Sequence, residues 1–195
     1  MDNALGFWIS DNAELFRYIG ELPALRNRAG RILLSGGVSA FLSPVFRTLY
    51  PESTIVAVDG RRDILDSAAK EDPLLETVCA PFESYCEPSY DIAVSALSLQ
   101  SLDTRELTGY LFNLYDSIVK GGLLFISFPD SLYPNPSPKT LVQSWYSMDE
   151  EVYMKRFMAG DVAKALSMIG FSMKSIEADS NPELEHVVSM ILERI

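Results

Sequence analysis

Histidine and cysteine, which bind most protein zinc ions, are almost missing from this chain of 195 residues. It has one histidine, His186, and two cysteines, Cys79 and Cys86. The cysteines do not form a C-x-x-C motif, and one histidine adds too few ligands to complete a zinc site. We therefore expect no bound metal and interpret both cysteines as reduced thiols of an intracellular protein.

Basic residues are also scarce. The chain has 16 Lys and Arg against 27 Asp and Glu, which gives a formal net charge of −11. Its densest basic cluster is Arg26, Arg28 and Arg31. Because nucleic-acid phosphates are bound through clustered Lys and Arg, we expect no nucleic-acid partner. The simplest interpretation of the negative charge is solubility.

Long apolar segments are missing as well. No apolar run approaches the roughly 20 residues that a membrane-spanning helix needs. Residues 1–6 lack the basic and then apolar order of a signal peptide. The sequence therefore predicts a soluble, cytoplasmic protein with no membrane partner.

Short apolar segments are plentiful, since 48% of the residues are hydrophobic. We expect a single domain over residues 1–195. Apolar runs bounded by glycine and proline predict strands, and apolar residues at helical spacing predict helices. The expected strands are residues 31–35, 54–59, 76–79, 90–96, 123–128, 171–177 and 186–192, and the expected helices are residues 11–28, 40–49, 63–70, 103–120 and 162–169.

The order of these elements predicts the fold class. Strands that alternate with helices indicate an α/β, doubly wound, mostly parallel seven-stranded sheet. The last two strands are joined by too short a turn for a crossover, so they should form a terminal antiparallel hairpin. A helical segment at residues 1–29 precedes this unit. An insertion at residues 129–158 follows the fifth strand.

A glycine pair and an acid suggest where a ligand binds. Gly36 and Gly37 follow the first strand, and Asp59 ends the second strand roughly 20 residues further on. Glycines let the backbone approach a ligand closely, and an acid at that position accepts hydrogen bonds from a ribose diol. The pattern favours a cofactor that contains a nucleoside. Alternatively, Asp59 caps the helix that follows it.

Five segments resemble the class I S-adenosylmethionine-dependent methyltransferases. Residues 32–40 resemble the glycine-rich cofactor loop, and residues 57–60 resemble the segment with the ribose-binding acid. Residues 90–99, 120–124 and 165–171 resemble the fourth strand, the Gly-Gly start of the fifth strand and the late helix that ends in Gly-Phe. The resemblance implies the Rossmann-like methyltransferase fold, with S-adenosylmethionine as the cofactor.

The resemblance also implies a set of cofactor-binding residues, which are Ser35, Gly36, Gly37, Ser39, Asp59, Gly60, Phe82, Ser95, Ala96 and Leu97. The first four would contact the methionine side, Asp59 the ribose and Phe82 the adenine. The loop departs from the family at three positions. Leu34 replaces the usual acid, and Val38 and Ala40 replace two glycines. The loop could instead be a simple turn, and Phe82 could fill the core.

The insertion at residues 129–158 is the expected acceptor side of the pocket. It leaves the carboxyl end of the fifth strand and is far longer than the usual 2–6 residues. Tyr133, Trp145 and Tyr146 suit the wall of a pocket for a flat, apolar acceptor. Alternatively, these aromatic residues cover the sheet or form an interface with a second subunit, so a homo-oligomer remains possible.

Three functions remain open at this stage. The first is methyl transfer to a small-molecule acceptor. The second is a catalytically silent relative that acts as a binding or regulatory subunit. The third is aminopropyl-type transfer from a related nucleoside, although Ser98, Gln100 and Ser101 stand where that reaction needs acids. The sequence identifies no catalytic residue, and His186 is more simply structural.

Overall fold

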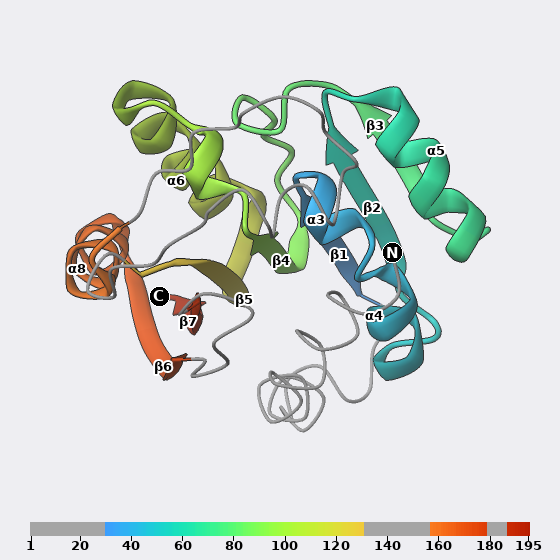
Figure 1. Cartoon of the computed structure of the whole chain (residues 1–195). Helices are drawn as coiled ribbons and strands as arrows, with labels where there is room; N and C mark the ends of the chain where they lie inside the picture. The colour runs from blue at the N-terminus through green and yellow to red at the C-terminus, as the bar shows by residue number, and fades with distance from the viewer. Residues whose placement is uncertain (1–29, 131–156, 179–186) are drawn as a thin grey trace.

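The computed structural model describes residues 30–130, 157–178 and 187–195. These residues form a seven-stranded sheet of order β3-β2-β1-β4-β5-β7-β6, with helices on both sides (Figure 1). Strands β1 to β5 run parallel, and β7 lies antiparallel between β5 and β6. The predicted doubly wound sheet with a terminal antiparallel hairpin is therefore confirmed.

The first four strands have the predicted bounds, because each is a short apolar run with a breaker at one or both ends. The last three are longer than predicted or shifted. The strands are β1 Arg31–Ser35, β2 Thr54–Asp59, β3 Glu76–Cys79, β4 Tyr90–Ala96, β5 Ile118–Pro129, β6 Phe171–Ala178 and β7 Val187–Arg194.

The helices bury two separate apolar layers against the sheet. Helices α3 (Gly37–Ala40), α4 (Ser43–Leu49) and α5 (Arg62–Glu71) share one layer with alternate residues of the strands, such as Leu34 and Ala57. Helices α6 (Thr104–Ser117) and α8 (Ala159–Ile169) share the other layer, with residues such as Leu33 and Val58. The parallel strands are thus buried on both faces, which is why they are almost continuously apolar.

The single helix predicted over residues 40–49 is wrong. The chain forms α3 and α4, with Phe41 and Leu42 between them. Pro44 has no N–H with which to bond the carbonyl of Ala40, so the helix is interrupted there. The second helix then starts with Pro44 in its first turn, where the missing donor has no effect.

The helix predicted over residues 103–120 begins correctly but ends too late. Asp103 caps α6 and forms a capping box with Glu106, and the helix ends at Ser117. Strand β5 starts at Ile118, which pairs with Tyr90, and an irregularity follows before Leu123 pairs with Ile92. Gly121 and Gly122 therefore lie inside β5 and not at its start.

These glycines lie within β5 because the irregularity requires them. Gly121 has a φ of 78°. A Cβ on Gly122 would lie 2.6 Å from Cγ2 of Ile118, 2.8 Å from the carbonyl oxygen of Asp91 and 2.9 Å from that of Val119. Because the last two obstacles are backbone atoms, only glycine fits at position 122.

Other bounds shift by one to three residues. Helix α8 starts three residues earlier than predicted, at Ala159, because Met158 occupies the N-cap position. Helix α5 and strand β6 are each slightly longer than predicted. The predicted helix at residues 11–28 and the single histidine lie outside the described residues.

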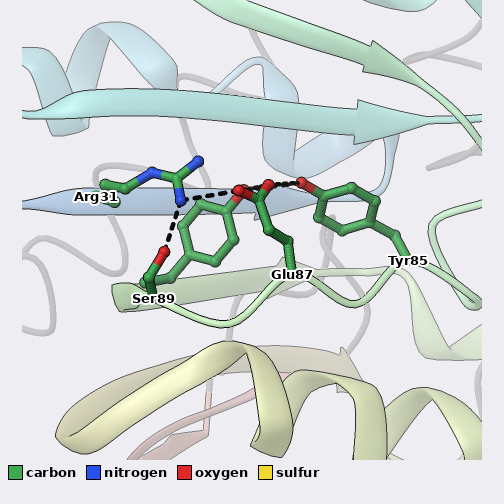
Figure 2. A network of polar contacts seen from close by, with 5 residues as sticks. Arg31, Tyr85, Glu87 and Ser89 are labelled. Atoms are coloured by element: carbon green, nitrogen blue, oxygen red, sulfur yellow. Dashed lines mark hydrogen bonds and ion pairs between the residues drawn. The ribbon is translucent and has the colours of Figure 1, made fainter.

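The connection from β3 to β4, residues 80–89, is fixed by a polar network at the amino end of the sheet (Figure 2). Arg31 donates to the Glu87 carboxylate at 3.0 Å and to the Ser89 hydroxyl at 2.6 Å. The Tyr85 and Tyr90 hydroxyls both bond the other oxygen of Glu87. These hydrogen bonds lower the pKa of Glu87, and the bond from Tyr85 has the largest effect. The network therefore anchors one end of the segment that carries Phe82.

Candidate functional site

The candidate site lies where β1 and β4 separate. The β1–β4 pairing stops at Leu34 and Val94, whereas β1 stays paired with β2 as far as Ser35 and Val58. The strand order reverses between β1 and β4, because the chain runs from β1 toward β3 on one side and from β4 toward β5 on the other. Ligands of doubly wound sheets bind in the crevice at such a switch point.

Two serine hydroxyls bridge the separated strand ends. The Ser39 hydroxyl donates to the carbonyl of Ser35 at 2.7 Å and accepts the N–H of Ala96 at 2.8 Å. The Ser98 hydroxyl lies 3.0 Å from the carbonyl of Ser35 and 3.2 Å from that of Ala96. Both side chains are buried. They supply the hydrogen bonds that the strand pairing no longer provides.

Gly36 forms the tight turn after β1, and its own neighbours explain why it is glycine. Its φ is 88°, a conformation that residues with a side chain rarely adopt. A Cβ there would also lie within 2.3 Å of the Ser98 hydroxyl oxygen. The glycine is therefore required by the packing of Ser98, with or without a ligand.

The three departures from the family loop are absorbed by the core. Leu34, Val38 and Ala40 are buried in the apolar layer that α3 shares with the sheet. Val38 lies within helix α3, so its backbone does not have to adopt a positive φ, which a branched side chain would disfavour. Gly37 begins this helix and is also buried. The loop thus exchanges two glycines for core contacts.

Asp59 lies at the end of β2, next to the glycine turn. Its side chain is only 6% exposed, and its Oδ1 accepts the N–H of Arg61 at 2.8 Å. Burial raises the pKa of this carboxyl group, while the hydrogen bond from Arg61, its charge and the N–H of Gly37 oppose that rise. The alternative that Asp59 caps the following helix is wrong, because the N-cap residue of α5 is Arg61 and no side chain caps that helix. Asp59 instead orders the turn before α5 and stands beside Gly37, and its contact with a ribose stays a prediction. Gly60, the next residue, is exposed.

A buried tyrosine lies beneath the turn on the opposite layer. The Tyr110 hydroxyl, from α6, is 2.9 Å from both the Ser35 and the Ser95 hydroxyls. Burial raises the pKa of Tyr110 to about 12, so its hydroxyl stays protonated at neutral pH. The half-buried ring of Phe82 packs edge-on against it at a centroid distance of 5.4 Å. Ser35, Ser95 and Phe82 are thereby joined around one side chain.

The turn after β4 carries backbone strain and an unpaired polar atom. Leu97 has a φ of 48°, one of two positive values found at non-glycine residues in the described part of the chain. The Gln100 amide nitrogen donates to the carbonyl of Leu97. Gln100 is 8% exposed, and its Oε1 has no hydrogen-bond partner among the residues that the structure describes.

The structure thus gathers most of the predicted cofactor residues around the carboxyl ends of β1, β2 and β4. Ala96, the last residue of β4, is fully buried and contributes its backbone rather than a side chain. The sequence reading missed three side chains that complete the cluster, which are Ser98, Gln100 and Tyr110. Tyr133, Trp145 and Tyr146, the predicted acceptor residues, lie outside the described residues.

Comparisons by sequence find no relative. No model of a protein family matches the chain, and no curated protein sequence matches it.

Comparisons by structure find many similar proteins. An S-adenosylmethionine-dependent methyltransferase from Mesorhizobium loti matches with a TM-score of 0.68 and 17% identity, over 94% of this chain and 98% of that one. Magnesium protoporphyrin IX methyltransferase from Synechocystis PCC 6803, with bound SAH, matches with a TM-score of 0.65 and 14% identity, over 95% and 84%. The cyclase SpnF matches with a TM-score of 0.65 and 13% identity, over 93% and 80%.

These matches establish the fold. The chain has the Rossmann-like fold of the S-adenosylmethionine-dependent methyltransferases over nearly its whole length. SpnF is described as a cyclase, so this fold also serves other chemistry. Two further searches cover the described residues alone: none of their helices is long and apolar enough to cross a membrane, and they hold no group of three metal-binding side chains.

Proposed function

We propose that this protein is an S-adenosylmethionine-dependent methyltransferase that acts on a small molecule. One observation carries the proposal: the buried Asp59 carboxylate, at the end of β2, stands beside the glycine turn that follows β1, and β1 borders the switch point of a methyltransferase-like sheet. Desolvation makes a buried carboxylate costly unless it is well paired. Two ribose hydroxyls would give it two further charge-assisted hydrogen bonds.

The chain's residues fit the nucleoside half of the cofactor. Asp59 would hold the ribose, and Gly60 leaves open space there, since a Cβ on it would meet no atom within 4 Å. Phe82 offers an aromatic face or edge to the adenine. Ser35, Gly36, Gly37, Ser39, Ser95, Ala96 and Leu97 would line the amino-acid end. When bound, the cofactor supplies an electrophilic methyl group on a sulfonium.

The protein's part in such a reaction is positioning. Methyl transfer is an in-line displacement, so it depends on holding the nucleophile in line with the methyl group and on excluding water. Residues 129–158, with Tyr133, Trp145 and Tyr146, would form the acceptor side. We propose a flat, apolar acceptor because these three aromatic side chains suit the wall of a pocket for such a molecule.

A silent relative with a binding or regulatory role is the second candidate. The packing of Ser98 over Gly36 favours it, because the turn is already filled by the chain's own side chain. All residues from Ser35 to Ala40 are buried. Such a protein would keep the fold without binding the cofactor.

Calorimetric titration with S-adenosylmethionine and S-adenosylhomocysteine tests the proposal. Asp59→Asn keeps the size of the side chain and one acceptor oxygen but loses the charge. It should weaken binding by about tenfold or more, since hydrogen bonds to charged groups contribute about 1.5–3 kcal/mol. Asp63→Asn is the matched control, because the Asp63 side chain is exposed and points its charge at Arg61.

The outcomes separate the candidate functions. Binding that Asp59→Asn weakens and Asp63→Asn leaves unchanged supports the methyltransferase. A folded protein that binds neither nucleoside supports the silent relative. Tighter binding of decarboxylated S-adenosylmethionine than of S-adenosylmethionine would instead indicate aminopropyl-type transfer.

A further inference from the structure

The connection from β3 to β4 passes along the candidate site. The N–H of Ala80, its first residue, donates to the carbonyl of Asp59 at 3.1 Å. Two residues further on, a ring carbon of Phe82 lies 3.9 Å from the point that a Cβ on Gly36 would occupy. The connection therefore runs from the buried acid at the end of β2 to the glycine turn after β1, and Phe82 is the residue that reaches that turn.

A tight turn at residues 81–85 is shaped by its own hydrogen bonds. The N–H of Ser84 donates to the carbonyl of Pro81 at 3.2 Å, and the N–H of Tyr85 donates to the carbonyl of Phe82 at 3.4 Å. The Ser84 hydroxyl also donates to the carbonyl of Pro81. These bonds set the shape of the turn, but none of them fixes its position against the rest of the protein.

Helix α6 fixes that position through one of its faces. Asn113 Nδ2 donates to the carbonyl of Glu83 at 3.0 Å. Within the part of the chain that the structure describes, this is the only hydrogen bond that joins residues 81–84 to another element. Tyr110 precedes Asn113 by three residues and so lies on the same face of α6, and its ring packs edge-on against Phe82. Two side chains of one helix thus hold two consecutive residues of the turn.

The hydrogen bond from Asn113 lies near the surface. Asn113 and Glu83 are both only partly buried. Water can therefore replace the amide group if it is lost, and no unpaired polar group is left in the core. We expect this bond to determine where the turn lies rather than whether the protein folds.

We propose that Asn113 is a positioning residue for the base of the nucleoside ligand. By holding the turn at residues 81–85, it keeps Phe82 beside the glycine turn, where the adenine would stack. The inference rests on the proposed function. A ring that is mobile in the free protein must be ordered when the base binds, and this ordering weakens binding. Asn113 places the ring before the ligand arrives.

A double-mutant cycle tests this role, with S-adenosylhomocysteine as the titrant. Phe82→Ala should weaken binding by about tenfold, because it removes a base–aromatic contact. Asn113→Leu keeps a similar size without a donor and should weaken binding by about fivefold. If Asn113 acts through Phe82, the double variant should bind about as weakly as Phe82→Ala alone. Asn113→Asp, which can only accept when ionised, should behave like Asn113→Leu.

Two controls separate positioning from a general effect on the helix or the site. Thr108→Ala removes a side-chain hydrogen bond from the exposed face of the same helix, so it should leave binding unchanged. Asp59→Asn combined with Asn113→Leu should show the product of the two single losses, because Asp59 would hold the ribose and not the base.

The free protein offers a readout that needs no ligand. Amide hydrogen exchange at Ser84 and Tyr85 should be faster in Asn113→Leu than in the wild type, because the turn is no longer held by α6. Unchanged exchange at both amides would show that the turn keeps its place without Asn113, which overturns the inference.

The titrations distinguish the inference from the function beneath it. Wild-type protein that does not bind S-adenosylhomocysteine overturns the proposed function and this role with it. Wild-type binding that both Asn113 variants leave unchanged overturns the role of Asn113 and leaves the proposed function standing. The same holds if the loss in the Phe82→Ala, Asn113→Leu double variant is the product of the single losses, or if neither Asn113 variant folds, because Asn113 is then structural.

Discussion

Tyr110 carries the polar contacts beneath the glycine turn. Tyr110→Phe removes a hydroxyl that contacts the Ser35 and Ser95 hydroxyls, while the ring can keep its contact with Phe82. Because two buried serines then lose a partner, the free energy of unfolding should fall by about 1–3 kcal/mol. Urea denaturation followed by circular dichroism measures this change.

Tyr115→Phe is the matched control for that substitution. The ring of Tyr115, also on α6, packs against Phe171 and under the Arg194 guanidinium. Its hydroxyl makes no hydrogen bond within the residues that the structure describes, so its loss should change the unfolding free energy by less than about 0.5 kcal/mol. Equal losses for the two variants would show that the hydroxyl network contributes nothing specific.

Two glycines in neighbouring elements should respond to alanine in opposite ways. In β5, the Cβ of Gly122→Ala meets backbone oxygens below 3 Å, so this variant should lose about 1–3 kcal/mol of stability. In α6, a Cβ on Gly109 meets nothing within 4 Å, so Gly109→Ala should gain about 0.5–1 kcal/mol from the higher helix propensity of alanine. Thermal and urea unfolding of both variants measure the difference. A stable Gly122→Ala protein would contradict the described start of β5.

The sequence predicts a helix or strand well where nearby residues determine it. Strands β1 to β4 match because their apolar runs are bounded by Gly30, Pro51 and other breakers. It fails where the cause lies elsewhere in the chain. The helix α6 gives way to β5 at Ile118 because Tyr90 offers that residue a strand partner, and no pattern near residue 118 records this.

The same distinction applies to the site. Asp59 and Gly36 are readable because a strand end and a tight turn have local signatures. Tyr110 was not among the predicted site residues, since its partner Ser35 is 75 residues away in the sequence. In the sequence, Ser98 and Gln100 were notable only because they stand where aminopropyl-type transfer needs acids. Their roles depend on contacts with the first strand and with the turn itself, which a linear pattern does not encode.

At the scale of the whole molecule, buried tyrosines set the response to alkaline pH. Burial raises the pKa of Tyr50 and of Tyr110 from 10.0 to about 12, and it also raises the pKa of Tyr90. Between pH 10 and 12 the unfolded chain loses these protons while the folded chain keeps them. The contribution of these tyrosines to the free energy of unfolding should therefore be constant below pH 10. Above pH 10 it should fall by about 1.4 kcal/mol per pH unit for each such group.

Urea titrations below pH 10 and at about pH 11 measure this loss. Tyr110→Phe should be less stable than the wild type at neutral pH but should show a shallower decline in alkali, because it lacks one titrating group. An identical decline in both proteins would mean that Tyr110 ionises in the folded state as easily as in the unfolded chain.

The hydroxyl groups at the meeting point of β1 and β4 have a consequence for how this edge of the molecule can change. A hydroxyl is both donor and acceptor, and it changes partner by rotating about one carbon–oxygen bond. Ser35, Ser39, Ser95, Ser98 and Tyr110 all present hydroxyls there. The edge can therefore exchange one set of partners for another while every strand and helix stays in place. The difference between two such states lies in where the protons are, so it would be visible to neutron diffraction or to hydroxyl-proton resonances when two superimposed backbones are identical.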